Sequence, residues 1–468
     1  MKLLRLAGLL AVLAAGAQAA VDTSDDSSEL VLLVSLSRHG SRAPNPITKK
    51  LCPNNLPNMK AYQVPPEQLT ERGMQQLEAA GRHIRELYVE EKKFLSPSFN
   101  GKTHEHFEAY FRADSANRCG QSAIAMGFGL YPDGTGPKGY SKQPIPVYMQ
   151  LEENEHDFTA EGACWDMLQE DNKNYGAGRG HDSIVKNIDI LQRAAKICGT
   201  DFYDGKQGEG SIAAIKDVSD MFLFDADEEL PPAPGLTPDL TFALSKLAFQ
   251  HLIERLYTFP RQITYEVGGF PELLMRNLNS AAVPGFDPDS ATKYYSYHGH
   301  RELLHGLGFM MGYKFNFAGL PEYNGSTPLI PGTTLFFELH RTPSAAGDGN
   351  APPQHFVRLF VWSPKTPRTP IKLPNCALDC PLAEFNAILN AHLALTGTWR
   401  DVCNFHPVFH PPTQPSLRQP TAERSLGSPS ASSRAWQWIW PTAILIAVGA
   451  VSALAYQRFL RRREYQPL

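Results

Sequence analysis

The pattern of apolar positions along the chain predicts several β-strands. Residues 30–36 form a short apolar run that ends at Ser37 and is soon followed by Gly40 and Pro44. A run of this length predicts a strand that is buried on both faces of a sheet. Four further stretches predict strands, the last two alternating as a hairpin does: 144–148, 293–298, 335–340 and 356–362.

Helical spacing dominates between these strands. Thr70 is suited to cap a helix, and the apolar residues that follow it fall on one helical face: Met74, Leu77, Ala80, Ile84 and Leu87. Between 152 and 279 the chain changes to charged helices, of which 183–197 and 240–257 are the clearest, separated by Gly- and Pro-rich joints. The alternation of strands and helices predicts an α/β protein, whose chemistry is expected at the carboxyl ends of the strands.

Both ends of the chain carry apolar segments of another kind. Residues 1–19 combine two basic residues, an apolar stretch and a small-residue end, and so predict a signal peptide that is cleaved after Ala19. Residues 436–456 contain no charge and are long enough to cross a bilayer core of roughly 30 Å. Because arginines follow this segment, the positive-inside rule predicts a single-pass protein whose N-terminal part is luminal or extracellular.

Two short regions flank the predicted membrane helix. Residues 405–435 are rich in Pro, Ser and Thr and predict a stalk that does not fold. The predicted cytosolic tail, 457–468, ends in Tyr465-Gln466-Pro467-Leu468. This ending resembles the tyrosine-based sorting signal that clathrin adaptors read, with a bare solvated tail as the alternative. We therefore expect a protein of the endosomal or lysosomal membrane that also reaches the plasma membrane.

The composition limits the kinds of partner that the protein can have and indicates whether its cysteines form disulfides. The net charge is −4, and no basic tract lies outside the tail, so nucleic acid is excluded as a partner. Seven cysteines in an oxidising compartment predict disulfides and leave at least one thiol over. Cys376 and Cys380 predict a local disulfide, since their surroundings offer too few ligands for a metal. Asn324 begins the N-glycosylation sequon of the predicted luminal part.

The residues that carry chemistry follow the first predicted strand. Arg38 and Arg42 are four residues apart and flank His39. Two guanidiniums suit an oxyanion, because each can donate paired hydrogen bonds to phosphate oxygens. An imidazole between them is a natural nucleophile toward phosphorus. From the chemistry alone, a solvated loop remains the alternative.

The pattern R-H-G-x-R-x-P, from Arg38 to Pro44, resembles the signature of the histidine acid phosphatases, the branch of the histidine phosphatase superfamily that includes lysosomal and prostatic acid phosphatases and phytases. The resemblance implies a phosphoglycerate-mutase-like three-layer sandwich with a mixed central sheet. Its core would comprise 20–150 and 281–404, with a mostly helical cap inserted at 151–280. Family members are often dimers, so a homodimer is one assembly that the resemblance implies.

The same resemblance assigns roles to residues. His39 would attack phosphorus and form a phosphohistidine, while Arg38, Arg42, Arg112 and His298 would hold the phosphate. No metal or cofactor is implied. Neighbouring guanidiniums would lower the pKa of His39 and keep it nucleophilic in an acidic compartment. The resemblance also pairs Cys164 with Cys403, and it gives no partner for three cysteines: Cys52, Cys119 and Cys198.

One position departs from the family. The aspartate that protonates the leaving alcohol would stand at 299, where this chain has Gly299. Glu302 is four residues past His298 and could replace it, although an ordinary helix-surface glutamate is the equal alternative. The pairs His156-Asp157 and His181-Asp182 fall in the wrong place, the second being kept as a minor alternative.

Three functions therefore stay open. The leading hypothesis is a membrane-anchored acid phosphatase that acts on small phosphate monoesters. A phytase or inositol-phosphate phosphatase is the second, although the extra lysines that such a pocket needs are not found. A degenerate surface protein that binds phosphate esters without turnover is the third, because of Gly299.

Overall fold

The computed structural model describes residues 28–99, 107–158, 162–342 and 354–408. The described strands form one eight-stranded sheet in the order β3-β2-β4-β1-β5-β6-β7, with β8 paired to β6. Their bounds are β1 Glu29–Arg38, β2 Ala109–Ala113, β3 Val147–Met149, β4 Tyr294–Gly299, β5 Thr334–Arg341, β6 His355–Ser363, β7 Thr366–Ile371 and β8 Cys380–Pro381. Strands β3, β2, β4 and β1 run parallel, whereas β5, β6 and β7 pair antiparallel, so the predicted mixed sheet is confirmed.

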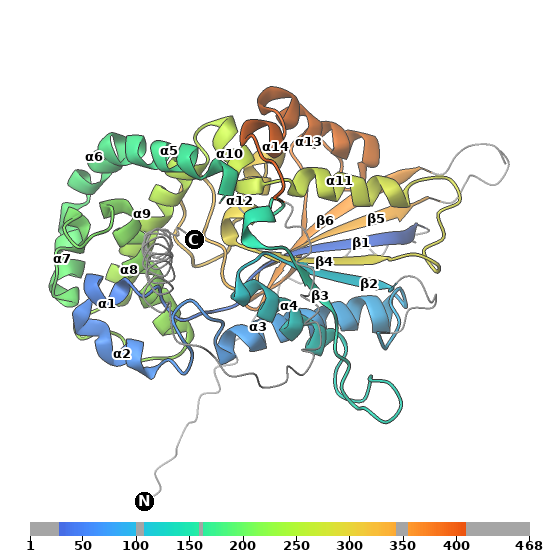
Figure 1. The fold of residues 1–468 in the computed structure, drawn as a ribbon, viewed down its shortest axis with the longest axis horizontal. Helices are drawn as coiled ribbons and strands as arrows, with labels where there is room; N and C mark the ends of the chain where they lie inside the picture. The colour runs from blue at the N-terminus through green and yellow to red at the C-terminus, as the bar shows by residue number, and fades with distance from the viewer. Residues whose placement is uncertain (1–27, 100–106, 159–161, 343–353, 409–468) are drawn as a thin grey trace, which may run out of the picture.

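Helices cover both faces of this sheet and complete the three layers (Figure 1). One face packs against α3 (Glu71–Ile84), the π-helical turn η2 (Arg85–Glu91) and α4 (Asn117–Leu130). The other face packs against helices from later in the chain: α10 (Pro260–Val267), α11 (Phe270–Ala281), α12 (Arg301–Met311) and α13 (Leu382–Thr396), followed by α14 (Trp399–Val402). Because apolar side chains meet β1 from both sides, its eight residues from Val31 to Arg38 are all buried.

A helical cap lies beside the sheet, on the left of Figure 1. Its helices are α5 (Trp165–Ala177), α6 (Arg179–Lys186), α7 (Ile188–Cys198), α8 (Ser211–Asp227) and α9 (Pro238–Leu256), with the 3₁₀ turn η5 (Phe202–Asp204). The cap has a hydrophobic core of its own, to which Leu191, Phe202 and Met221 contribute.

The cap differs from the expected insert at 151–280 in two ways. The stretch after the signature also contributes to the cap: it forms α1 (Thr48–Leu51), η1 (Pro53–Asn55) and α2 (Leu56–Ala61), and Leu51 belongs to the core of the cap. At the other end, α10 and α11 pack on the sheet rather than in the cap. Their apolar faces, which include Val267 and Leu274, explain why they do so.

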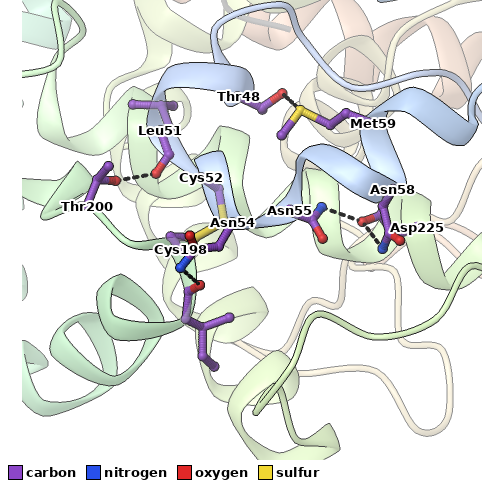
Figure 2. The surroundings of a disulfide bond; sticks show 11 residues. Thr48, Leu51, Cys52, Asn54, Asn55, Asn58, Met59, Cys198, Thr200 and Asp225 are labelled. Carbon is purple, nitrogen blue, oxygen red and sulfur yellow. Dashed lines mark hydrogen bonds between the residues drawn. A yellow bond between two sulfur atoms is a disulfide. The ribbon is translucent and has the colours of Figure 1, made fainter.

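Disulfides hold the cap in place. Cys52 is bonded to Cys198, which ties η1 to the end of α7, and Asn55 and Asn58 beside it donate hydrogen bonds to Asp225 on α8 (Figure 2). Cys164 is bonded to Cys403, and Cys376 to Cys380, as expected. Cys119 is the cysteine left unpaired, and it is buried.

Across the described part of the chain, no helix is both long and apolar enough to span a bilayer. The predicted signal peptide, 1–19, the predicted membrane helix, 436–456, and the tail, 457–468, lie outside the described residues.

Candidate active site

Three neighbouring strands bring the candidate residues together at one edge of the sheet. In the register of β1 with β4, Ser37 pairs with His298 and Arg38 with Gly299. In that of β2 with β4, Ala113 pairs with His298. The residues just past these strands continue the contact, because the backbone NH of His39 donates to the Gly299 carbonyl over 3.0 Å. The predicted position at the carboxyl ends of parallel strands is therefore where these side chains lie.

The loop after β1 is held by close packing of two glycines. A Cβ on Gly40 would lie 2.2 Å from the carbonyl oxygen of Gly73, so no other residue fits there without a shift of α3. The backbone NH of Gly40 donates to Ser122 Oγ over 3.2 Å, and that of Ser41 to Gln76 Oε1 over 2.8 Å. The signature loop is thus fixed by both helices of one layer, α3 and α4.

His39 is oriented as a nucleophile. Its side chain is buried, and Nδ1 lies 2.8 Å from the carbonyl oxygen of Gly40. Because a carbonyl oxygen only accepts, Nδ1 carries the hydrogen, and Nε2 keeps its lone pair. Burial lowers the pKa of His39 well below its usual value, and the positive charges of Arg118, His300, Arg38 and Arg42 lower it further. Nε2 can therefore stay unprotonated in acid.

Three guanidiniums face this histidine with unused donors. The Nε atoms of Arg38, Arg42 and Arg118 are buried and have no hydrogen-bond partner among the described residues. Arg38 donates to the Leu329 carbonyl, and Arg42 donates to that of Ala43 and lies over the Phe224 ring. Burial lowers the pKa of Arg38 to about 9 and that of Arg42 to about 10. Buried N–H groups without partners are costly unless they meet an acceptor, so the cluster suits an anion.

Arg112 lies differently from these three arginines. Its guanidinium donates to Asp157 over 2.6 Å and to Glu155 over 3.3 Å, and it stacks on the Phe158 ring. Burial raises the pKa of Glu155 to about 7, so Asp157 is the main counter-charge of Arg112 in acid. Its role in holding phosphate stays a prediction, while Arg118 supplies the third positive charge next to His39. Arg118 is not among the phosphate-binding residues that the family resemblance implied, although it follows Arg112 by only six residues.

His298 is completely buried at the end of β4. Its Nε2 is 2.9 Å from Ser296 Oγ, and its Nδ1 has no partner among the described residues. Burial lowers the pKa of His298 to about 3, so the ring is neutral in the mildly acidic range in which His39 would act. It can meet a phosphate oxygen through a hydrogen bond rather than through charge.

Glu302 begins α12 and is buried rather than exposed on the helix surface. Its carboxylate accepts a hydrogen bond from Arg301 Nε over 3.1 Å. Burial favours the neutral acid, but Arg301 and then His300 outweigh it, and the pKa of Glu302 is lowered. Glu302 is therefore held ionised, which disfavours it as a proton donor. At Gly299 a Cβ would find its nearest neighbour at 3.4 Å, so the site has room for a side chain there.

A residue that sequence reasoning missed is His300, which follows Gly299. Its ring centroid is 5.4 Å from that of His39, and its Nε2 is 3.2 Å from Asp114 Oδ1. That distance is within the range of a direct hydrogen bond, which joins the end of β2 to the residue after β4. The signal was present in the sequence as a second histidine after a β-strand, two residues past His298.

A match to a family model shows which protein family the chain belongs to. The model for branch 2 of the histidine phosphatase superfamily matches residues 29–361, from the start of β1 into β6. The chain belongs to this branch. The match spans every candidate residue described above, and it makes the protein a phosphatase of the branch, as the signature predicted.

Known proteins resemble the chain over most of its length. The lysosomal acid phosphatase of Xenopus laevis is 26% identical over 407 residues, which are 85% of this chain and 83% of that protein. The prostatic acid phosphatase of Mus musculus is 22% identical over 395 residues, or 81% and 90% of the two chains. Among solved structures, Hafnia alvei phytase with tartrate superposes with a TM-score of 0.58 at 19% identity, covering 79% of this chain and 98% of that one. At this identity the superposition shows a shared fold alone.

Proposed function

We propose that this branch 2 phosphatase is an acid phosphatase that hydrolyses phosphate monoesters through a phosphohistidine. The observation that carries the proposal is the unprotonated Nε2 of His39 beside three guanidiniums whose Nε donors are unpaired. A phosphoryl group would accept these hydrogen bonds, and the arginines would stabilise the charge that develops on its oxygens in the transition state. Arg38, Arg42 and His298 keep the phosphate-binding roles expected of them, and Arg112 keeps its role as a hypothesis.

The reaction would proceed in two displacements. The Nε2–P bond forms as the P–O bond to the alcohol breaks, and the alcohol oxygen receives a proton. Water then attacks phosphorus, the N–P bond breaks, and inorganic phosphate is released. Positive charge from the guanidiniums supplies what a divalent cation supplies in other phosphoryl-transfer sites.

Acid activity follows from the surroundings of His39. A histidine at its ordinary pKa of about 6.5 would be mostly protonated at pH 5 and unable to attack. Burial and then the nearby positive charges lower the pKa of His39 well below that value. The nucleophile therefore stays available in an acidic compartment.

Acid-quench trapping tests the proposal. The ectodomain, 21–404, is mixed with ³²P-labelled phosphate ester at pH 5, quenched, and analysed for phosphohistidine. We expect label on wild type and none on His39→Ala. His83→Ala is a matched control, because His83 packs against Trp362 away from the site and should leave labelling intact. Label that persists in His39→Ala would refute the nucleophile, and absence of turnover in wild type would favour a protein that only binds.

A phytase is the second candidate, since phytases share this fold. The cations that the cap and α12 bring near Asp220 are each paired with an acid, Lys216 with Asp217 over 2.8 Å and Arg301 with Asp220 over 2.9 Å. These pairs leave little free positive charge for the other phosphates of an inositol polyphosphate. We expect kcat/KM for p-nitrophenyl phosphate to exceed that for inositol hexakisphosphate at pH 5, and the reverse order would favour the phytase.

The cellular location remains a proposal that rests on sequence pattern. The apolar segment 436–456 with the arginines after it, the Tyr465–Leu468 motif and the similarity to a lysosomal acid phosphatase support a single-pass protein of endosomes or lysosomes. Tyr465→Ala should move the protein to the plasma membrane without changing activity. An unchanged distribution would show that the tail carries no sorting signal.

Asn324 is the proposed glycosylation site. It is exposed in a turn closed by hydrogen bonds between Tyr323 and Ser326, and it has a positive φ of 52°. An exposed turn can admit a glycan, so Asn324→Gln should remove an endoglycosidase-sensitive mass shift.

A further inference from the structure

We propose that His300, held by Asp114, donates the proton to the leaving alcohol and so replaces the acid that is missing at Gly299. The inference rests on the proposed function, because it names the proton donor of that same reaction. It rests on the position of His300 next to the nucleophile and on the way its two ring nitrogens are used.

His300 enters the site from the loop between β4 and α12. The backbone contact of His39 with Gly299 brings these two segments together, and the rings of His39 and His300 lie edge to face at 72°. The centroid distance of 5.4 Å makes the two rings neighbours, so a phosphoryl group bound at His39 lies next to His300. In an in-line displacement the alcohol oxygen leaves on the side opposite Nε2 of His39, and the proposal places Nδ1 of His300 against that oxygen.

The two nitrogens of His300 have different surroundings. Nε2 lies 3.2 Å from Asp114 Oδ1 and 3.8 Å from Cys119 Sγ, so protein groups already bind this nitrogen. Nδ1 is buried and has no hydrogen-bond partner among the described residues. The Asp114 carboxylate therefore fixes the ring through Nε2 and leaves Nδ1, which has no acceptor among the described residues, as the nitrogen that can exchange a proton with a substrate.

Asp114 is a buried carboxylate that holds His300 in place. It is only 2% exposed, and its Oδ1 also accepts the backbone NH of Ala116 over 2.8 Å. Burial opposes its ionisation, yet His300 and this backbone hydrogen bond keep the pKa of Asp114 below its usual value. A buried aspartate that stays ionised is a suitable partner for an imidazolium, and it acts as a positioning residue because it does not touch the substrate.

Both positively and negatively charged groups lie around His300. Arg118 on α4 and His39 face it from the anion site, and Glu302 on α12 interacts with its charge. Glu302 is less suited to the donor role, since its carboxylate is held ionised by Arg301.

The proton balance closes over one turnover. In the first step the ester P–O bond breaks, its electron pair stays on the alcohol oxygen, and Nδ1 of the imidazolium gives that oxygen a proton. His300 is then neutral. In the second step Nδ1 takes a proton from the attacking water as the new P–O bond forms and the N–P bond of His39 breaks. Phosphate leaves with His300 protonated again.

Leaving-group dependence tests the assignment. The aryl ester p-nitrophenyl phosphate needs little protonation of its leaving oxygen, whereas the alkyl ester glycerol 2-phosphate needs much. We expect His300→Gln to lower kcat/KM for the alkyl ester about 10²- to 10⁴-fold, and to lower that for the aryl ester much less. Imidazole added to His300→Ala should restore part of the alkyl activity. Glu302→Gln should reduce both esters alike.

The controls separate folding and the proposed function from this inference. Competitive inhibition by inorganic phosphate reports an intact anion site in each variant, and phosphohistidine trapping with the aryl ester reports the nucleophile. If wild type gives no phosphohistidine, the proposed function fails. If it does, but His300→Gln and His300→Asn lose both esters equally, or Glu302→Gln shows the alkyl-selective loss, then His300 is not the donor.

Asp114→Asn provides a readout that a merely structural role would not move. The amide can still occupy the place next to Nε2 but carries no charge, so kcat for the alkyl ester should fall while its KM stays near that of wild type. kcat for the aryl ester should fall less. Equal losses of kcat for the two esters, or no loss for either, would overturn the role of Asp114.

Discussion

Arg301 on α12 and Asp220 on α8 are joined by two parallel hydrogen bonds of 2.9 Å each. One residue belongs to the sheet-covering layer and the other to the cap, and their side chains are only 12% and 9% exposed. The pair therefore joins the cap to the core within a protected environment, next to the arginines proposed to bind phosphate. Asp220 also lies close enough to Arg38 and Arg42 to oppose in part the lowering of their pKa values by burial.

Breaking this pair should destabilise the protein strongly. Asp220→Asn leaves Arg301 buried without its main counter-charge, which costs about 3–5 kcal/mol when one partner of a buried ion pair is lost. The free energy of unfolding from urea titration measures the loss. The double variant Asp220→Asn/Arg301→Gln should recover part of it, since neither charge is then left alone. The matched control is Glu29→Gln, because the Glu29–Arg341 pair is exposed and should cost less than about 1 kcal/mol.

Arg118 and Arg112 should respond differently to truncation. Arg118 has a free buried donor beside His39, whereas Arg112 is held by Asp157 and Glu155. Arg118→Ala should therefore lower kcat/KM by roughly 10²- to 10³-fold and leave stability little changed. Arg112→Ala should chiefly destabilise the fold, because it removes the guanidinium donor that two buried acidic side chains, Asp157 and Glu155, share. A larger loss of kcat/KM in Arg112→Ala, at equal stability, would restore Arg112 as the third phosphate arginine.

The acid limb of the pH profile should report the charge of Arg118. Burial and then Arg118 are the first two causes of the lowered pKa of His39. When Arg118 is replaced by Met, a positive neighbour is lost, so the pKa of His39 should rise toward its ordinary value. The acid limb of kcat/KM should then move to higher pH and activity at pH 4 should fall more than activity at pH 7. A limb that stays in place would mean that His39 does not set it.

The sequence predicted the central strand and the position of the signature loop because both depend on local pattern. Residues 30–36 are apolar because β1 is central and covered on both faces, and the signature loop follows directly. Neither Arg118 nor His300 could be assigned in that way. Their roles depend on α4 and the β4–α12 loop approaching the same strand end, and no spacing along the chain reveals that approach. The Cys52–Cys198 bond escaped prediction for the same reason, since the contact of the Cys52 segment with α7 joins residues that are far apart in the sequence.

The Cys52–Cys198 disulfide should stabilise the cap by limiting its unfolded state. It closes a loop with a sequence separation of 146 residues, and disulfides of this kind contribute about 2–4 kcal/mol. The double variant Cys52→Ala/Cys198→Ala should lower the melting temperature while keeping the phosphohistidine. Cys376→Ala/Cys380→Ala is the matched control, because its separation is only 4 residues and its loss should cost less. Equal losses in both variants would argue against a role for loop length.

Glu338 on β5 should make stability depend on pH in the acidic range where the enzyme is proposed to work. It is 1% exposed and accepts hydrogen bonds from Tyr88 over 2.7 Å, from Arg368 over 2.7 Å and from His340 over 2.9 Å. Burial alone would raise its pKa, but His340 and Arg368 outweigh burial and lower the pKa of Glu338 to about 2.

The sign of the pH effect follows from that direction. A carboxylate with a lowered pKa in the folded state contributes stability above its unfolded pKa of about 4.5, and this contribution is lost as pH falls toward about 2. The difference corresponds to about 3 kcal/mol. Urea unfolding at pH 6, 4.5 and 3 should therefore show wild type losing stability relative to Glu338→Gln as pH falls, so that the two curves converge. Glu91→Gln, at an exposed position, should run parallel to wild type throughout. Curves for Glu338→Gln that also stay parallel to wild type would show that Glu338 does not carry the acid sensitivity of the fold.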